Sequence, residues 1–342
     1  MRILVTGAAG FIGSNYVRFV LSEYPDADVV AVDKLTYAGN LDNLAALEEN
    51  SRFQFVHADI CDAGAIDEAM AGCDALVNIA AESHVDRSVM DPAAFVRTNV
   101  EGIRVLLEAA RAHGVERIVQ VSTDEVYGHV PVGTSTEDAR LAPRNPYSAS
   151  KAGGELLALA YFTSFGLPVM ITRGANTIGP RQYPEKVVPV FVTNAIDDKP
   201  LPIYGEGEAV RNYMYVADHC AGVDLVLRRG EPGAVYNVGV EFEVNTVTLA
   251  TSILDALGKP HALMRLIEDR PGHDFRYSLD SSRLAALGWQ PQYAFQQALV
   301  ETVNWYVDNE DWWRPIKSGG YGEYYERNYA ERLARSRPLV AG

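Results

Sequence analysis

Three glycines near the amino terminus constrain the fold of this chain most strongly. The run Gly7-Ala-Ala-Gly10-Phe-Ile-Gly13 follows the apolar segment Ile3–Thr6 directly and opens a periodic helical segment. In this position Gly7 permits a tight turn, Gly10 lets the backbone approach a pyrophosphate, and Gly13 lets strand and helix pack closely. The first helical turn offers N–H groups that have no partner inside the helix and can bind negative charge. The run therefore predicts a dinucleotide-binding turn, the alternative being a turn that binds nothing.

The rest of the first half alternates short β-branched runs with helical stretches. Strands are expected at Ile3–Thr6, Val29–Asp33, Phe53–His57, Ala75–Ile79, Ile118–Ser122 and Val169–Thr172. Periodic helical segments are expected between them, at Phe11–Ser22, Thr98–His113 and Ser150–Phe165. This alternation predicts an α/β fold of the Rossmann type, a doubly wound parallel sheet with helices on both faces.

The pattern loosens in the second half. Pro and Gly are frequent in 179–207, which indicates short helices and hairpins. Tyr213–Arg228 followed by Ala234–Val238 again predicts a helix and then a strand that rejoins the sheet. We therefore expect a dinucleotide-binding domain at 1–172, rejoined by about 212–238, and a smaller interleaved α/β lobe formed by 173–211 and 239–342.

Charge and composition argue against several classes of protein. A net charge of −15 would repel the phosphates of a nucleic acid over most of the surface. No apolar run approaches the roughly 20 residues that a membrane-spanning helix needs. The three cysteines, Cys61, Cys73 and Cys220, are too scattered for a disulfide framework or a zinc site. We expect a cytoplasmic protein without a membrane segment, a nucleic-acid partner or a metal.

The end of the second expected strand indicates which dinucleotide binds. Asp33 stands 20 residues after Gly13, where a carboxylate accepts hydrogen bonds from the adenosine ribose. A carboxylate there repels a 2′-phosphate, which favours NAD over NADP, although Lys34 weakens this inference slightly. The glycine spacing G-x-x-G-x-x-G resembles that of the extended short-chain dehydrogenase/reductase family.

Tyr147 and Lys151 are the first candidate catalytic pair. Their spacing, Y-x-x-x-K, places both side chains on one face of a helix. A lysine ammonium close to a phenol favours the phenolate, and we expect it to lower the tyrosine pKa toward the range of a working acid and base. The same lysine can hold the nicotinamide ribose. A surface Tyr–Lys pair is the alternative.

Two adjacent carboxylates narrow the range of reactions that the expected site could catalyse. Asp124 and Glu125 lie at the end of an expected strand, where open α/β sheets bind ligands. Simple epimerases and reductases of the family carry a small hydroxyl residue at one of these positions. Two acids directed into a pocket repel each other, so one pKa rises and the other group can stay ionised. A dehydration needs such an acid and base together. The alternative is a helix cap or an exposed acidic turn.

With these motifs the chain resembles dTDP-glucose 4,6-dehydratases over essentially its whole length. It shares the runs Ala81–Ser88, Tyr183–Lys186, Pro202–Gly205 and Arg270–Asp274. The resemblance implies a cofactor site made of Gly7, Gly10, Phe11, Ile12, Gly13, Asp33, Lys34, Leu35, Thr36, Asp59, Ile60, Ala80, Ala81, Thr98, Tyr147 and Lys151. It implies a substrate site made of Ser83, His84, Thr123, Asn176, Glu185, Lys186, Val187, Pro202, Tyr204, Arg211, Asn245, Arg270, His273 and Tyr277. Of the cations, Arg211 and Lys186 are the expected phosphate contacts.

The resemblance also implies a mechanism. Tyr147 takes the proton from the sugar O4 while the C4 hydride passes to NAD⁺, and Thr123 steadies the charge near O4. Glu125 then removes the C5 proton, and Asp124 protonates the C6 hydroxyl, which leaves as water. Return of the hydride to C6 yields the 4-keto-6-deoxy sugar. NAD is regenerated in each turnover.

The second half departs from the usual pattern of these enzymes. Thr177 stands where an asparagine commonly contacts the cofactor, and Arg173 and Arg181 add charges. Asn212 and Tyr213 replace the usual Asp and Trp. These changes leave open which sugar and which base the substrate carries, and a UDP-sugar stays an alternative substrate. A UDP-sugar 4-epimerase, which has no use for two acids, and a non-catalytic NAD-binding sensor also stay open.

The resemblance implies a homodimer in which the helices Thr98–His113 and Ser150–Phe165 pair between subunits. Both segments are amphipathic, as buried helices of a monomer would also be. The aromatic segment from Trp305 to Tyr329 is expected to cover the substrate lobe or to contact a second subunit.

Overall fold

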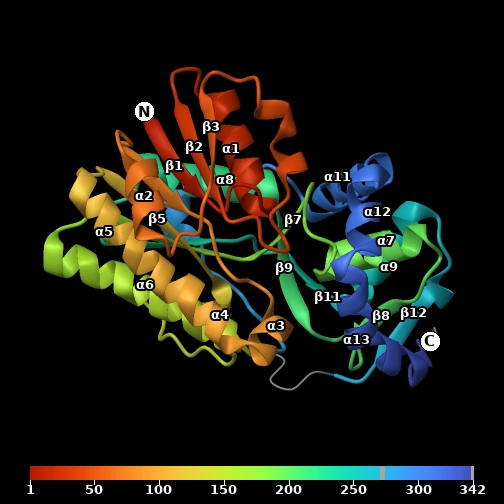
Figure 1. Ribbon diagram of the computed structural model, residues 1–342. Coiled ribbons are helices and arrows are strands. Elements are labelled where there is room, and N and C mark those ends of the chain that lie inside the picture. Colours follow the sequence, from red (N-terminus) through yellow and green to blue (C-terminus); the bar gives the residue numbers. More distant parts are fainter. Residues whose placement is uncertain (270–273, 340–342) are drawn as a thin grey trace.

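The computed structural model describes residues 1–269 and 274–339. A parallel sheet forms the centre of the lobe that contains the N-terminus (Figure 1). Among these residues, seven strands lie in the order β10-β6-β5-β4-β1-β2-β3, and all neighbours are parallel. The strands are β1 Arg2–Thr6, β2 Asp28–Asp33, β3 Phe53–His57, β4 Ala75–Asn78, β5 Arg117–Thr123, β6 Val169–Gly174 and β10 Val235–Val238. The predicted doubly wound α/β fold is confirmed, and the six predicted strands correspond to β1 to β6.

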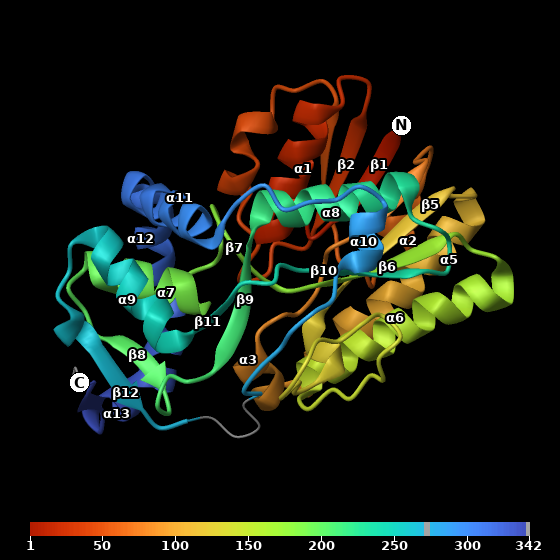
Figure 2. The same ribbon diagram turned by 180° about the vertical axis from the view of Figure 1, so that it is seen from behind.

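Helices cover both faces of this sheet (Figure 2). One face carries α1 (Phe11–Glu23) and α8 (Val216–Arg229), and the other carries α2 (Ala63–Met70), α5 (Ile103–His113) and α6 (Pro146–Phe165). Because successive strand residues point to opposite faces, Ile3 and Val5 pack toward α1 while Leu4 packs toward α5. Both faces are therefore buried, as a parallel sheet requires.

The strand order reverses between β1 and β4, and this positions the site. From β1 the sheet continues through β2 and β3 on one side and through β4, β5 and β6 on the other. Loops that leave the carboxyl ends of β1 and β4 diverge, and such a switch point is where open α/β sheets bind ligands.

The second lobe contains two small sheets within the described residues. One consists of β7 (Asn176–Ile178), β9 (Val210–Tyr215) and β11 (Glu243–Asn245), and the other of β8 (Leu201–Tyr204), β12 (Met264–Ile267) and β13 (Arg337–Pro338). Its helices are α7 (Val187–Ile196), α9 (Thr246–Leu257), α11 (Phe295–Asp308), α12 (Glu310–Ser318) and α13 (Gly320–Ala334). The aromatic C-terminal segment packs into this lobe, where Trp313, Tyr321 and Tyr329 are buried.

Short elements complete the chain. They are α3 (Val85–Met90), α4 (Pro92–Val96), α10 (Ser282–Ala286), the π-helical turn η3 (Arg97–Gly102) and the 3-10 turns η1 (Leu41–Asn43), η2 (Ala45–Leu47), η4 (Asp124–Tyr127) and η5 (His261–Leu263). Within the described ranges, no helix is both long enough and apolar enough to cross a bilayer.

Two predicted helix starts are wrong, and one of them is that of α6, which begins at Pro146 and not at the predicted Ser150. The helix expected over Tyr213–Arg228 begins only at Val216, because Tyr213 and Met214 belong to β9 and pair with β7. Apolar residues at a strand end continue into the apolar pattern of the following helix, so periodicity alone does not locate the junction. The chain then returns to the central sheet through α8 and β10.

Candidate active site

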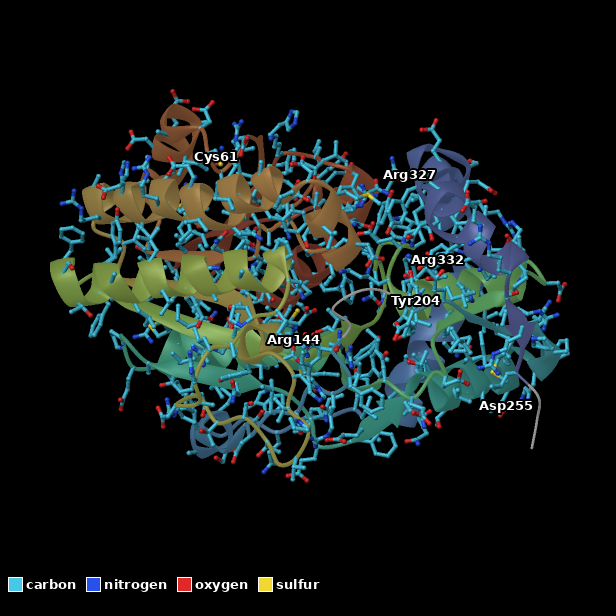
Figure 3. All side chains as sticks on the ribbon, turned by 90° about the horizontal axis from the view of Figure 1, so that it is seen from below. Cys61, Arg144, Tyr204, Asp255, Arg327 and Arg332 are labelled. Carbon is cyan, nitrogen blue, oxygen red and sulfur yellow. The ribbon has the colours of Figure 1, made fainter. Side chains whose placement is uncertain are left out.

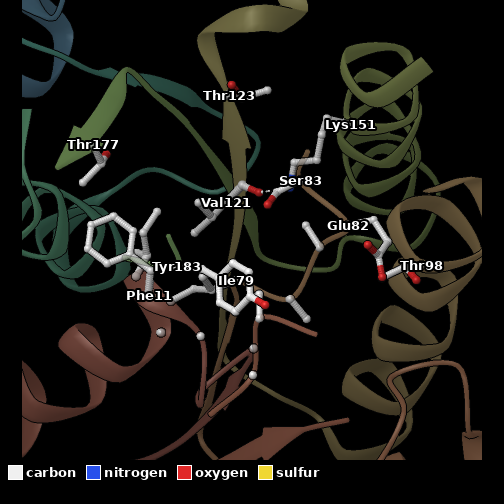
Figure 4. A pocket seen from close by; sticks show the side chains of 18 of the residues that line it. Phe11, Ile79, Glu82, Ser83, Thr98, Val121, Thr123, Lys151, Thr177 and Tyr183 are labelled. Atoms are coloured by element: carbon white, nitrogen blue, oxygen red, sulfur yellow. Dashed lines mark hydrogen bonds between the residues drawn. The ribbon is translucent and has the colours of Figure 1, made fainter. Parts of the chain in front are cut away.

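A cavity of about 300 Å³ lies along the carboxyl edge of the sheet at the switch point. In Figure 4, Phe11 of α1, Thr98 of η3 and Lys151 of α6 come together from separate elements. The expected cofactor residues that line this first cavity are Gly7, Gly10, Phe11, Ile12, Gly13, Asp33, Lys34, Thr36, Asp59, Ile60, Ala80, Ala81, Thr98, Tyr147 and Lys151. Leu35 does not line it and packs against the hydrophobic core instead.

The glycines of the loop leave backbone space that a side chain on Gly7 or Gly13 would fill. Gly7 has a φ of 65°, and a Cβ on it would lie 2.7 Å from the backbone nitrogen of Ala80. A Cβ on Gly13 would lie 2.0 Å from the carbonyl oxygen of Gly7. Gly10 caps α1, so the N-terminus of this helix faces the cavity without a side chain in between. The loop therefore has the shape and the free N–H groups that a pyrophosphate needs.

Asp33 holds the neighbouring loops by its carboxylate. One oxygen accepts the backbone N–H of Ala9 at 2.9 Å and the other accepts that of Leu35 at 2.7 Å. Burial raises the pKa of Asp33, and these two hydrogen bonds oppose the rise. Each carboxylate oxygen can accept a further hydrogen bond, so the group fits a ribose diol.

Lys34 does not act as a free cation next to Asp33. Its ammonium lies 2.8 Å from the carboxylate of Asp59. Burial alone would raise the pKa of Asp59, but the hydrogen bonds from Lys34 and from the Cys61 backbone lower it. Because this pair neutralises Lys34, the lysine adds little attraction for a 2′-phosphate, and the preference for NAD expected from Asp33 stands without that reservation.

Asp124 and Glu125 occupy the turn η4 directly after β5. Thr123 caps this turn, since its hydroxyl accepts the backbone N–H of Glu125 at 3.3 Å. The acids are therefore not the cap, and Asp124 is buried, so the pair is neither a helix cap nor an exposed acidic turn. Burial and the neighbouring charge of Glu125 raise the pKa of Asp124 to about 7, while Arg211 opposes the rise. Asp124 is therefore the carboxyl group that keeps its proton, as expected for one of two adjacent acids.

Tyr147 and Lys151 lie on α6 and line the same cavity, but one expectation about them is wrong. Burial raises the pKa of Tyr147 far above its usual value, and the charges of Glu125 and Asp124 raise it further. Lys151 does not lower it, because its ammonium is directed to the carbonyl oxygen of Val121 at 2.6 Å (Figure 4). Burial lowers the pKa of Lys151 to about 8 against the charge of Glu155.

A second cavity of about 160 Å³ continues from the first into the second lobe. Glu125 lines both cavities, as do Asn176, Glu185 and Lys186. The other expected substrate residues that line the second cavity are His84, Val187, Pro202, Tyr204, Arg211 and Tyr277. Ser83 and Thr123 line the first cavity.

Asn245 lines neither cavity. Its side chain accepts the backbone N–H of Thr248 at 2.7 Å and so caps α9, which the family pattern could not distinguish from a substrate contact. Arg270 and His273 lie outside the described residues.

The cations of the second cavity are held in place by backbone carbonyls. Lys186 donates to the carbonyl of Ser83 at 2.6 Å, and Arg211 donates to those of Asp274 and Phe275 at 2.7 and 3.0 Å. The guanidinium of Arg211 also lies 4.4 Å from the ring centre of Tyr277. Two positive side chains thus border a cavity in an acidic protein, which suits a diphosphate.

Three of the five departures from the family pattern avoid the cavities, whereas Thr177 lines the first cavity and Tyr213 the second. Arg173 is buried and donates to Glu155 at 2.6 Å and to the Tyr127 hydroxyl at 2.7 Å. Arg181 lies outside the linings of both cavities. Thr177 does line the first cavity, where its hydroxyl lies 2.8 Å from Nδ1 of His219. The unusual arginines therefore have no direct part in choosing the ligand.

Several lining residues were not identified from the sequence. Glu82 and His219 belong to the first cavity, and Phe191 and Tyr329 belong to the second. Glu82 stands within the family run Ala81–Ser88, so its neighbours offered a signal. Tyr329 lies far along the chain from the other lining residues, and no local pattern connects it with them.

Comparison with known proteins identifies the family. The family model for GDP-mannose 4,6 dehydratase matches residues 4–302. A dTDP-glucose 4,6-dehydratase of Streptomyces niveus is 50% identical over 323 residues, which cover 93% of this chain and 96% of that one. The low-salt glycan biosynthesis protein Agl12 of Haloferax volcanii is 47% identical and covers 91% of this chain over its whole length.

A solved structure agrees with these relatives. The dTDP-glucose 4,6-dehydratase DesIV of Streptomyces venezuelae, crystallised with NAD bound, matches with a TM-score of 0.91 and 48% identity, covering 93% of this chain and all of that one. The resemblance inferred from the motifs is thereby confirmed. The chain belongs to the GDP-mannose 4,6 dehydratase family and, within it, to the dTDP-glucose 4,6-dehydratases.

Proposed function

We propose that this protein is an NAD-dependent hydro-lyase that converts dTDP-glucose to dTDP-4-keto-6-deoxyglucose. The observation that carries the proposal is the placement of Asp124, Glu125 and Tyr147 around one cavity, with Glu125 also bordering the second. Two acids and a phenol in one place supply the proton transfers of a dehydration, whereas a 4-epimerase needs no second acid.

The first cavity suits NAD by the shape of its glycine loop and by the lone pairs of Asp33. When bound, NAD⁺ supplies the hydride acceptor at C4 and the later hydride donor at C6, and its positive charge favours the phenolate of Tyr147. Lys151, which lines this cavity, is proposed to hold the nicotinamide ribose.

The proton transfers at C4 fall to Tyr147 and Thr123. Tyr147 takes the O4 proton as C4 is oxidised, and the hydroxyl of Thr123 donates to the oxygen as its charge develops. Burial dominates the pKa of Tyr147 and raises it, while hydrogen bonding to Thr123 opposes that rise. The product of this step is a C4 ketone, which acidifies the neighbouring C5 proton.

Loss of water falls to Glu125 and Asp124. Glu125 removes the C5 proton, while Asp124 gives its proton to the C6 hydroxyl, so that the C6–O bond breaks and water leaves. The raised pKa of Asp124 keeps this proton available near neutral pH. After C6 is reduced, Glu125 returns its proton to C5. Tyr147 then releases the O4 proton and Asp124 regains one, so that all three groups return to their starting states for the next turnover.

The second cavity is assigned to the nucleoside diphosphate. Arg211 and Lys186 are proposed to bind the phosphates, and the aromatic side chains of Phe191, Tyr204 and Tyr329 suit the flat face of a base. This division follows two lobes, a cofactor domain at about 1–174 that α8 and β10 rejoin, and a substrate lobe that contains β9 and most of the chain after β10.

We further propose that the protein acts in the cytoplasm as a homodimer formed through α5 and α6. Leu156 and Phe165 of α6 are 55% and 56% exposed, and Val96 of the adjoining α4 is 56% exposed. Exposed apolar side chains on these adjoining helices favour contact with a second subunit. Light scattering of the Leu156→Glu variant tests this, and an unchanged mass would contradict it.

The activity is tested with dTDP-glucose carrying deuterium at C4. Mass spectrometry should show loss of one water with the label moved to C6. UDP-glucose in parallel decides between the two nucleotides. Release of an isomer of unchanged mass would instead establish a 4-epimerase, and no turnover of any nucleotide sugar would favour a sensor.

A further inference from the structure

One face of α13 borders the second cavity directly through Tyr329 and indirectly through Asn328 and Arg332, which contact the lining residue Tyr204. Asn328, Tyr329 and Arg332 are spaced so that the first and third lie one turn apart, with Tyr329 beside them. Figure 3 shows Arg332 next to Tyr204 in the second lobe. The amide of Asn328 donates to the Tyr204 hydroxyl at 3.3 Å, and a guanidinium N–H of Arg332 donates to the same oxygen at 2.9 Å.

These contacts fix the orientation of the Tyr204 ring. Both donors converge on one phenolic oxygen, and the carbon centre of the Arg332 guanidinium also lies 5.4 Å from the ring centre. Tyr204 itself ends β8, which pairs with β12. An aromatic side chain held at its backbone and at its hydroxyl keeps one orientation, and this preorganisation reduces the entropy lost on ligand binding.

Tyr329 adds a wall to the same cavity. It is 7% exposed, lines the second cavity, and its ring centre lies 6.2 Å from that of Tyr204. The two rings therefore border one space, and flat aromatic walls suit a heterocyclic base better than a sugar.

The position of α13 is tied to the helix that forms another wall. The Tyr325 hydroxyl accepts the side-chain amide of Asn194 at 2.9 Å, and Lys317 donates to the other side of that amide at 2.9 Å. Asn194 lies on α7, which also carries the lining residues Val190 and Phe191. These bonds fix the C-terminal segment relative to α7, and so they fix the cavity walls that the two segments carry.

We propose that α13 is a positioning element of the nucleotide subsite, in which Tyr329 forms one wall and Asn328 and Arg332 orient Tyr204. It sets the affinity for the nucleoside part of the substrate without contacting the reacting sugar. The inference rests on the proposed function, because it assigns the second cavity to the nucleotide.

The test measures dTDP binding to the holoenzyme by isothermal titration calorimetry, together with the kinetics on dTDP-glucose. Arg332→Ala should raise the Kd for dTDP about tenfold, because Tyr204 loses a donor that fixes its ring before the nucleotide binds. KM should rise far more than kcat falls. The matched control is Arg335→Ala, directly after the C-terminal end of the same helix, whose side chain is exposed and pairs with Glu331 at 3.9 Å. It should bind dTDP like the unaltered protein.

A double-mutant cycle separates orientation of Tyr204 from general damage to the helix. In a Tyr204→Phe background the hydroxyl is gone, so Arg332→Ala should add less than about threefold to Kd. A full tenfold increase in that background would overturn the role assigned to Arg332. Tyr329→Phe keeps the wall and loses only the hydrogen bond to Tyr204, so its affinity should fall less than about threefold. Tyr329→Ala should lose about tenfold, and equal affinity in both variants would overturn the wall.

The outcomes distinguish this inference from the proposed function. If the unaltered protein binds dTDP and dehydrates dTDP-glucose while Arg332→Ala binds dTDP normally, the inference about α13 fails alone. If the unaltered protein neither binds dTDP nor turns over dTDP-glucose, the proposed function fails, and the inference fails with it.

Discussion

The ammonium group of Lys151 donates a hydrogen bond of 2.6 Å to the carbonyl oxygen of Val121, two residues before the end of β5. This bond joins α6, which carries Tyr147, to the strand that leads into Asp124 and Glu125. The bond fixes the position of the Tyr147 phenol relative to the two carboxyl groups. Lys151 therefore holds the site together in addition to any contact with the cofactor.

Lys151→Met should lower kcat by about a hundredfold or more, as removal of one preorganised donor does in other enzymes. The reason is loss of both the bond to Val121 and the positive charge beside the cofactor. Steady-state kinetics and the NAD content of the purified protein measure the effect. Lys199→Met is the matched control, because that lysine is exposed and pairs with Asp197 at the surface. Full activity of Lys151→Met would contradict the assignment.

Asp124→Asn should stop the reaction after oxidation at C4. An amide cannot give a proton to the C6 hydroxyl, whereas Tyr147 and Lys151 remain unchanged. In a single turnover, the absorbance of the reduced cofactor should rise and persist, and water loss should slow by at least a hundredfold. Dehydration at the normal rate would show that another group is the acid.

The same variant should change stability with pH. The pKa of Asp124 is about 7 in the folded protein against a usual 3.8, so ionising this buried group costs the native state free energy. The stability that the protonated form contributes is complete below about pH 3.8 and is lost as pH rises through 7. Asp124→Asn should therefore be more stable than the unaltered protein at about pH 8 and no more stable at about pH 4. Urea denaturation at both pH values checks this, and an equal difference at both would contradict it.

Arg173 should be needed for folding, not for ligand choice. Its guanidinium pairs with Glu155 in the interior, and both side chains are at most 5% exposed. Arg173→Met leaves a buried carboxylate without its cation and should cost about 3–5 kcal/mol in the free energy of unfolding. The double variant with Glu155→Gln should recover part of this loss. Arg104→Met removes an exposed, solvent-screened pair with Glu101 and should leave the free energy of unfolding nearly unchanged.

Arg87 connects the lobes through a stack of side chains. Its guanidinium lies 3.8 Å from the ring centre of Tyr37 and 4.6 Å from that of Tyr324, and it donates to Glu185 at 3.0 Å. Tyr324→Leu removes one ring and should destabilise the protein by about 1–2 kcal/mol. Tyr324→Phe keeps the ring and should be nearly neutral, because the Tyr324 hydroxyl is buried without a hydrogen-bond partner among the described residues. Equal losses in the two variants would contradict the cation–π contact.

Local sequence patterns determined the cofactor side of this protein. The strands β1 to β6, the glycine loop and the helical spacing of Tyr147 and Lys151 follow from backbone sterics and from periods of two and 3.6 residues, which act over short stretches. Asp33 and the Asp124–Glu125 pair could be placed because parallel strands bring their carboxyl ends to one edge. The family runs added most of the substrate residues, although Asn245 proved to be a helix cap.

Tertiary structure alone decided what depends on contacts between distant segments. The pairing of Lys151 with Val121, the raised pKa of Tyr147, the burial of Arg173 and the approach of Arg332 to Tyr204 all join residues that no local period relates. Burial and partner choice are set by the packing of whole elements, so the charge state and role of such side chains follow only when the chain is folded.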